Sequence, residues 1–112
     1  MTKQATDLYI KACMKTWLLC EASVHAESEK ALPRTKLLEE CAGCAKACFA
    51  VVSGLVSDTG DTGDLVLKCI LHCRQCALEC AKYPKEADLQ YCCIVSTICA
   101  DTLKEIAIQQ LN

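Results

Sequence analysis

Residues 69–80 read CILHCRQCALEC, so that cysteine stands at positions 69, 73, 76 and 80. An α-helix turns by about 100° per residue, which gathers these four cysteines within a stripe about 60° wide. A helix in a bundle normally carries leucine and isoleucine along the face that it buries. The spacing therefore predicts a helix whose buried face carries thiols in place of hydrocarbon.

The same pattern recurs along the rest of the chain. Three cysteines between residues 41 and 48 form a second narrow stripe, and the pairs at 13 and 20 and at 92 and 99 each lie about 20° apart on a helical wheel. Only Cys93 departs, by about 100° from its neighbour. The candidate metal ligands are Cys13, Cys20, Cys41, Cys44, Cys48, Cys69, Cys73, Cys76, Cys80, Cys92, Cys93 and Cys99.

Chain breakers divide the sequence into four predicted helices, at about residues 4–29, 33–57, 64–83 and 85–110. Pro33 suits the first turn of the second helix. The aspartates of the linker at 58–64 suit the start of the third helix by capping and dipole, and Pro84 marks the boundary before the fourth. Long helices joined by short loops pack as antiparallel neighbours. We predict an all-α fold, a single domain over residues 1–112: an antiparallel up-down-up-down four-helix bundle with a cysteine-lined core.

Chain direction distributes the thiols unevenly along this bundle. Cys20, Cys41, Cys80 and Cys92 all approach the end that carries the first and third loops. Near the other end the stripes hold apolar residues, namely Tyr9, Val52, Leu55, Leu65, Leu103 and Ile106. We therefore expect a thiol column closed at one end and nearer to solvent at the other. Trp17, Val24 and Ser96 also fall on the stripes, which leaves two separate clusters possible.

Composition and charge exclude several classes of function. Twelve basic and fourteen acidic residues give a net charge of −2, so there is no basic surplus for nucleic acid or anionic lipid. No run approaches the roughly 20 apolar residues of a membrane span. The N-terminus MTKQATDLYIKAC has no apolar core of a signal peptide. We expect a cytoplasmic protein without a membrane or nucleic-acid partner, whose thiols are reduced.

Reduced thiols at this spacing suit a soft ion of low coordination number. Cysteines at i and i+4 place their β-carbons about 5–6 Å apart, so two sulfurs can share one ion, and soft thiolates select Cu(I). Zn²⁺ with four thiolates leaves each site at −2, whereas Cu(I) with one bridging thiolate per ion is neutral, and buried charge must be compensated. Two-coordinate binding predicts between about 6 and 12 Cu(I) ions per chain.

Other interpretations of the thiols remain open. The CxxC pairs 41/44 and 73/76 also occur in zinc and iron–sulfur proteins, so a carrier or sensor of another soft metal is the first alternative. Twelve cysteines would also suit a disulfide-stapled helical interaction module, although the CX3C pairs 69/73 and 76/80 share one helix instead of opposite arms of a hairpin. Cysteines that only pack as small hydrophobes are the third.

Two histidines are further candidates. His25 falls near the thiol-rich end, where it is a predicted ligand that hands copper inward or else a surface residue. His72 lies about 80–100° from the centre of its stripe, which suits a helix interface or a copper contact at the edge of the core. No nucleophile, base and orienting group occur together, so we predict a protein that is not an enzyme.

These motifs resemble the bacterial four-helix-bundle copper storage proteins, whose cores are lined with cysteine. Cys69-x3-Cys73-Arg74-Gln75-Cys76-x3-Cys80 is close to the CxxxCxxCxxxC pattern of that family's third helix. Leu37-Leu38-Glu39-Glu40 leading to Cys44-x3-Cys48 is similar to its second helix. The pairs 13/20 and 92/99 match alternate positions in the first and fourth helices. The resemblance covers nearly the whole chain.

The departures from the family are as informative as the matches. Trp17, Val24, Ser96 and Leu103 stand where the family often has cysteine, and Cys41 and Cys93 are extra, which implies a smaller copper capacity. The resemblance also implies storage or buffering of multiple Cu(I) ions, assembly as a homo-oligomer, specifically a tetramer, and a cytosolic location. A copper chaperone or a low-molecular-weight thiol is the partner expected to supply the ions.

Overall fold

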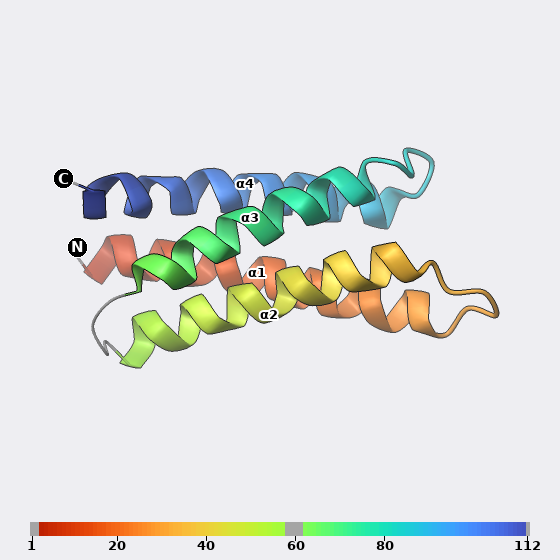
Figure 1. Cartoon of the computed structure of the whole chain (residues 1–112), viewed down its shortest axis with the longest axis horizontal. Coiled ribbons are helices and arrows are strands. Elements are labelled where there is room, and N and C mark those ends of the chain that lie inside the picture. The colour runs from red at the N-terminus through yellow and green to blue at the C-terminus, as the bar shows by residue number, and fades with distance from the viewer. Residues whose placement is uncertain (1–2, 58–61, 112) are drawn as a thin grey trace.

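The computed structural model describes residues 3–57 and 62–111, and these residues form four helices and no strand (Figure 1). The helices are α1 (Lys3–Ser28), α2 (Thr35–Ser57), α3 (Gly63–Cys80) and α4 (Ala87–Leu111). The predicted all-α class with four helices is therefore confirmed. Of the linker aspartates predicted to cap the third helix, Asp58 and Asp61 lie outside the described residues, whereas Asp64 lies in the first turn of α3.

Helix α2 begins two residues later than predicted. Pro33 lies before the helix, because the backbone N–H of Arg34 donates to the Glu27 carboxylate at 2.8 Å. The carbonyl of Arg34 then accepts the N–H of Leu38 at 3.1 Å and starts the helical hydrogen bonds. A side chain of α1 thus determines where α2 starts, which no local pattern indicates.

Helix α3 ends at Cys80, three residues before the predicted end. The N–H groups of Lys82 and Tyr83 bond to the carbonyls of Glu79 and Cys80, three residues back, so the chain tightens into turns after the helix. The Gln90 amide of α4 donates to the carbonyls of Cys80 and Tyr83 at 3.3 and 3.0 Å. This side chain gives a second hydrogen bond to each of these carbonyls, which also accept the backbone N–H groups of Tyr83 and Glu86, and so links the turn after α3 to α4.

The four helices lie side by side in a body that measures 46 × 22 × 20 Å. Helix α1 contacts α2 and α4, and α3 contacts the same two helices. Figure 1 shows the chain running away from its N-terminus along α1 and α3 and returning along α2 and α4. The α1–α2 and α3–α4 connections therefore lie at one end, here called the loop end, and both termini lie at the other, the terminal end.

Buried apolar side chains lie at both ends of the cysteine stripes. Tyr9, Val51, Val66, Leu103 and Ile106, all at most 3% exposed, form the larger part at the terminal end, and Leu37 and Leu89 lie towards the loop end. Val52, Leu55 and Leu65, which were also predicted on the buried stripes, pack against this core but are only partly buried. The fully buried residues continue the cysteine stripes with helical spacing: Val51 is three residues after Cys48, and Val66 is three residues before Cys69.

Helix α2 is long and apolar enough to cross a membrane, by length and composition alone. The sequence was expected to contain no segment that meets this criterion. A buried helix of a bundle meets the same criterion. Helix α2 contributes six residues to the core cluster, which are Leu37, Cys41, Cys44, Ala45, Cys48 and Val51. Its apolar character is thus accounted for by packing within this fold.

Candidate metal centre

Eleven of the twelve cysteines are buried in the core, each at most 1% exposed, and all twelve are free thiols. Every helix contributes to this set, because each carries cysteines on the face that meets its two neighbours. The set consists of Cys13 and Cys20 of α1, Cys41, Cys44 and Cys48 of α2, Cys69, Cys73, Cys76 and Cys80 of α3, and Cys92 and Cys99 of α4. Ten of their sulfurs form four overlapping groups, and the eleventh, that of Cys69, lies 3.6 Å from Cys48 and 3.9 Å from Cys73.

The first group lies nearest the apolar residues of the terminal end. The sulfurs of Cys13, Cys48 and Cys99 all lie within 4.8 Å of one another, with 3.9 Å between Cys99 and Cys13. Cys69 adds a further sulfur, 3.6 Å from that of Cys48. Each of these four residues comes from a different helix, so all four helices meet here.

Two groups occupy the middle of the bundle. Cys44, Cys48 and Cys73 form one, in which the sulfurs of Cys44 and Cys73 are 3.6 Å apart. Cys20, Cys44 and Cys76 form the other, with 3.9 Å between the sulfurs of Cys20 and Cys76. Cys48 and Cys44 each belong to two groups and thereby join them.

The fourth group contains four sulfurs, those of Cys41, Cys76, Cys80 and Cys92. The sulfurs of Cys76 and Cys41 are 3.9 Å apart, and Cys92 also lies 3.8 Å from Cys20 of the preceding group. Because Cys76 is shared with that group, the eleven sulfurs form one unbroken column. The alternative of two separate clusters, which the sequence left open, does not describe this structure.

Two buried hydroxyl groups, those of Thr16 and Ser96, lie among the buried cysteines. Ser96 of α4 is fully buried and its Oγ donates to the sulfur of Cys76 at 3.8 Å. In α1 the buried position between Cys13 and Cys20 belongs to Thr16, whose Oγ1 donates to the Ala12 carbonyl at 2.9 Å. The prediction of Trp17 there is wrong. Its ring is partly buried and packs 5.6 Å from the ring of Phe49, between α1 and α2.

Hydrogen bonds between the buried thiols shift their pKa values in both directions. Hydrogen bonds from neighbouring thiols, that of Cys44 first, together with burial raise the pKa of Cys20 above its ordinary value. Hydrogen bonds with Cys76, Cys80 and Cys92, and then burial, raise the pKa of Cys41, whereas the hydrogen bond with Cys20 lowers the pKa of Cys92 to about 4. A column of anions without counter-charge would be strongly unfavourable in this interior. Metal binding must therefore displace protons.

The remaining predicted ligands lie outside the four groups. His25 is on the surface, where its imidazole is 77% exposed and lies 3.3 Å from the Glu29 carboxylate. Cys93 is partly buried beside the core. His72 lies against α2: a methyl group at Gly43 would come within 3.1 Å of its Nδ1. Among the described residues, the groups able to hold a metal contain cysteine alone, so a copper role for these three stays a prediction.

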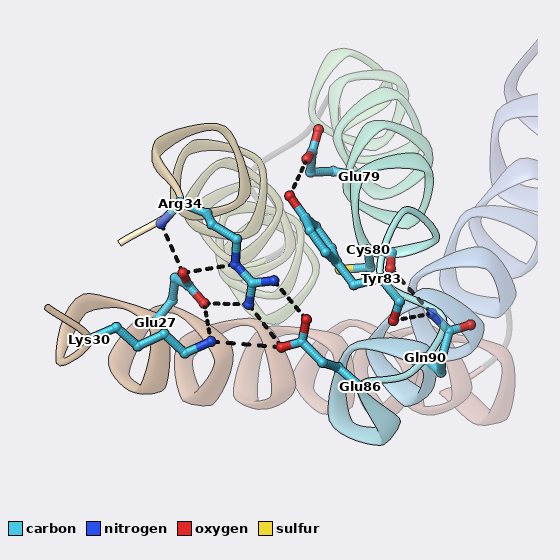
Figure 2. A network of polar contacts seen from close by, with 8 residues as sticks. All are labelled: Glu27, Lys30, Arg34, Glu79, Cys80, Tyr83, Glu86 and Gln90. Carbon is cyan, nitrogen blue, oxygen red and sulfur yellow. Dashed lines mark hydrogen bonds and ion pairs between the residues drawn. The ribbon is translucent and has the colours of Figure 1, made fainter. Parts of the chain in front are cut away.

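A polar network that the sequence analysis did not identify covers the loop end (Figure 2). Arg34 bridges two carboxylates, since its guanidinium donates to Glu27 at 2.8 and 3.0 Å and to Glu86 at 2.6 and 2.9 Å. It also lies over the ring of Tyr83, 4.2 Å from the centroid. Lys30 joins both carboxylates at 3.0 and 3.7 Å. The network ties the α1–α2 connection to the α3–α4 connection.

The network shifts the ionisation of its members. The Arg34 guanidinium, through its hydrogen bonds, lowers the pKa of Glu27 to about 2, although burial acts in the opposite direction. The same guanidinium lowers the pKa of Glu86. A surface hollow of about 540 Å³ adjoins these residues, and its walls contain no cysteine. This hollow is therefore distinct from the sulfur column.

No family model, curated protein or solved structure matches the chain. The sulfur geometry and the motifs of the sequence are therefore the features that indicate its function.

Proposed function

We propose that this chain is a cytoplasmic protein that stores or buffers Cu(I) inside an antiparallel, cysteine-lined four-helix bundle. One observation carries the proposal: eleven buried thiols form a continuous column of sulfurs, with neighbours 3.6–3.9 Å apart. A single structural metal site needs no more than four such ligands. Eleven in contact suit many ions that share bridging thiolates.

The chemistry of the donors favours Cu(I) over other ions. All the groups consist of thiols, without histidine or carboxylate among the described residues, and purely soft donors select soft ions of low coordination number. Bridging thiolates also balance the charge of Cu(I) one for one, which keeps the interior neutral. Burial holds the ions away from water and oxidants, which suits storage and not catalysis.

The resemblance stated above supports the same proposal. It adds assembly as a homotetramer and loading from a copper chaperone or a low-molecular-weight thiol. A carrier of zinc or an iron–sulfur cluster and a disulfide-stapled interaction module are the competing functions. Metal-dependent spectra separate a zinc or iron–sulfur carrier from copper storage, and the count of free thiols separates the disulfide-stapled module.

The decisive experiment is an anaerobic titration of the reduced protein with Cu(I) against a competing chelator, after the free thiols have been counted in denaturant. Storage predicts tight uptake that saturates between about 6 and 12 ions per chain. Tight binding of fewer than two ions would contradict storage. A low count of free thiols before copper is added would instead support the disulfide-stapled module.

A matched pair of variants locates the copper. Cys48→Ser removes a sulfur that belongs to two groups, and Cys93→Ser removes the one cysteine outside the buried column. We expect a lower capacity for Cys48→Ser and an unchanged capacity for Cys93→Ser. Equal losses in both would mean that the column is not the copper site.

A further inference from the structure

The group at the loop end differs from the other three in its number of sulfurs. Cys41, Cys76, Cys80 and Cys92 all lie within 4.8 Å of one another, whereas every other group contains three cysteines. They come from α2, α3 and α4 and are at most 1% exposed. Four buried thiols at mutual contact are the ligand set of a closed tetrahedral site.

The separations agree with tetrahedral coordination. Zn²⁺ binds thiolate sulfur at about 2.3 Å, which puts the corners of the tetrahedron about 3.8 Å apart. The sulfurs of Cys76 and Cys41 are already 3.9 Å apart, and the other pairs need to contract by less than about one ångström to reach this value. Small rotations of the side chains can supply that change.

The backbone around these ligands is fixed in advance. Cys80 is the last residue of α3, and Gln90 of α4 donates to its carbonyl at 3.3 Å and to that of Tyr83 at 3.0 Å (Figure 2). Gln90 stands two residues before Cys92 on the same helix. The hydrogen bonds thus hold the end of α3 against the helix that supplies the fourth ligand, which lowers the cost of forming the site.

We propose that Cys41, Cys76, Cys80 and Cys92 form a tetrahedral thiolate site for one divalent ion of the zinc class. Binding replaces four S–H bonds with four metal–sulfur bonds, releases four protons to solvent and leaves the site with a charge of −2. Because neutral Cu(I)–thiolate clusters avoid the cost of this buried charge, the site takes the divalent ion only where Cu(I) is absent. The other three groups each supply three sulfurs, with Cys69 beside the first of them at 3.6 Å from Cys48. The inference does not depend on copper storage, since it concerns the metal that this group selects when Cu(I) is absent.

The test uses Co²⁺ as the probe, because Co²⁺ bound to four thiolates in a tetrahedron has intense visible and thiolate charge-transfer absorption. Reduced, metal-free protein is titrated anaerobically with Co²⁺ and then with Zn²⁺. We expect saturation at one Co²⁺ per chain and complete bleaching by one equivalent of Zn²⁺. Absorption without the tetrahedral bands, or saturation at several ions with equal affinity, would overturn the proposal.

Two variants on α3 assign the site. Cys80→Ser removes a proposed ligand, and Cys69→Ser removes an equally buried thiol of the same helix that belongs to no group of the set. We expect Cys80→Ser to weaken Co²⁺ binding at least tenfold and to lose the tetrahedral spectrum, and Cys69→Ser to retain both. Cys41→Ser, on another helix, repeats the test if Cys80→Ser is not helical by circular dichroism. Equal effects of Cys80→Ser and Cys69→Ser would overturn the assignment.

Cu(I) titration of the same proteins separates this inference from the storage proposal. Copper uptake without a tetrahedral Co²⁺ site would contradict the divalent site alone. A Co²⁺ site without uptake of several Cu(I) ions would contradict storage alone.

Discussion

A buried cysteine in this core is a small apolar side chain when protonated and an anionic ligand when a metal displaces its proton. Ser96 has nearly the same size, lies fully buried, and contacts the sulfurs of Cys76 and Cys92 at 3.8 and 4.0 Å. Its hydroxyl is a hard donor that a soft ion does not favour. Ser96 therefore lies beside the candidate metal ligands without being a suitable ligand itself.

Replacing this serine should extend the site. We expect Ser96→Cys to raise the Cu(I) capacity by about one ion, because the new sulfur lies beside two existing ligands. The control is Thr97→Cys, which adds a thiol at the next residue, on the exposed face of α4. Chelator competition measures both capacities. An increase in the control but not in Ser96→Cys would contradict the arrangement of the column.

Among the elements, the two connections at the loop end depend on one side chain. Arg34 lies between the helices α1 and α2, yet it bonds to Glu86, the residue before α4, as well as to Glu27 in the last turn of α1. Glu27 is only 4% exposed, so its carboxylate depends on these donors. A buried carboxylate that loses its partner is destabilising.

We expect Arg34→Gln to lower the free energy of unfolding by about 2 kcal/mol at neutral pH, as for the loss of charged hydrogen bonds. Arg74→Gln is the matched control, because Arg74 forms an exposed pair with Asp101 at 3.3 Å and exposed pairs contribute at most about 1 kcal/mol. Urea unfolding measures both variants. A larger effect of Arg74→Gln would contradict the role of the network.

The same network predicts how stability depends on pH. The pKa of Glu27 is lowered from 4.5 to about 2 in the folded chain, so the unfolded chain binds more protons between these values. This contribution to stability is complete above pH 4.5 and is lost as the pH falls towards 2. Unfolding measured across this range should show the loss in the wild type and a smaller loss in Arg34→Gln. Parallel curves would exclude Glu27 as the cause.

The candidate metal site of the whole molecule exists only when the four helices are assembled. The group of Cys13, Cys48 and Cys99 alone takes sulfurs from α1, α2 and α4. The unfolded chain has no such arrangement, so an ion bound to these groups would stabilise the folded state. The apolar residues of the terminal end and the buried cysteine side chains fill the core by themselves.

We therefore expect the copper-free protein to remain helical and copper loading to raise its unfolding temperature. When the free concentration of the ion is 100 times its dissociation constant, binding at one site adds about 2.7 kcal/mol to the free energy of unfolding. Circular dichroism during heating, before and after removal of copper by a chelator, measures both quantities. A copper-free chain without helical signal would show instead that the metal, and not packing, drives folding.

Periodicity accounts for much of the agreement between sequence and structure. The spacing of Cys69, Cys73, Cys76 and Cys80 predicted one buried face, and all four side chains are buried. Where prediction depended on distant partners it was less accurate. Thr16 and not Trp17 is buried in α1, and Val51 and not Val52 in α2, because the rotation of a helix about its axis depends on the neighbours that it meets.

The sequence by itself determined the four helices and the face of each that carries thiols, since both follow from local periodicity and chain breakers. Only the tertiary structure decided which sulfurs meet across helices, that they form one column, and that four of them gather at the loop end. It also brought Arg34 to Glu27 and Glu86, which lie 7 and 52 residues away in the chain. The physical reason is that helical spacing constrains directions within one helix, whereas the shift and rotation between helices depend on packing throughout the bundle.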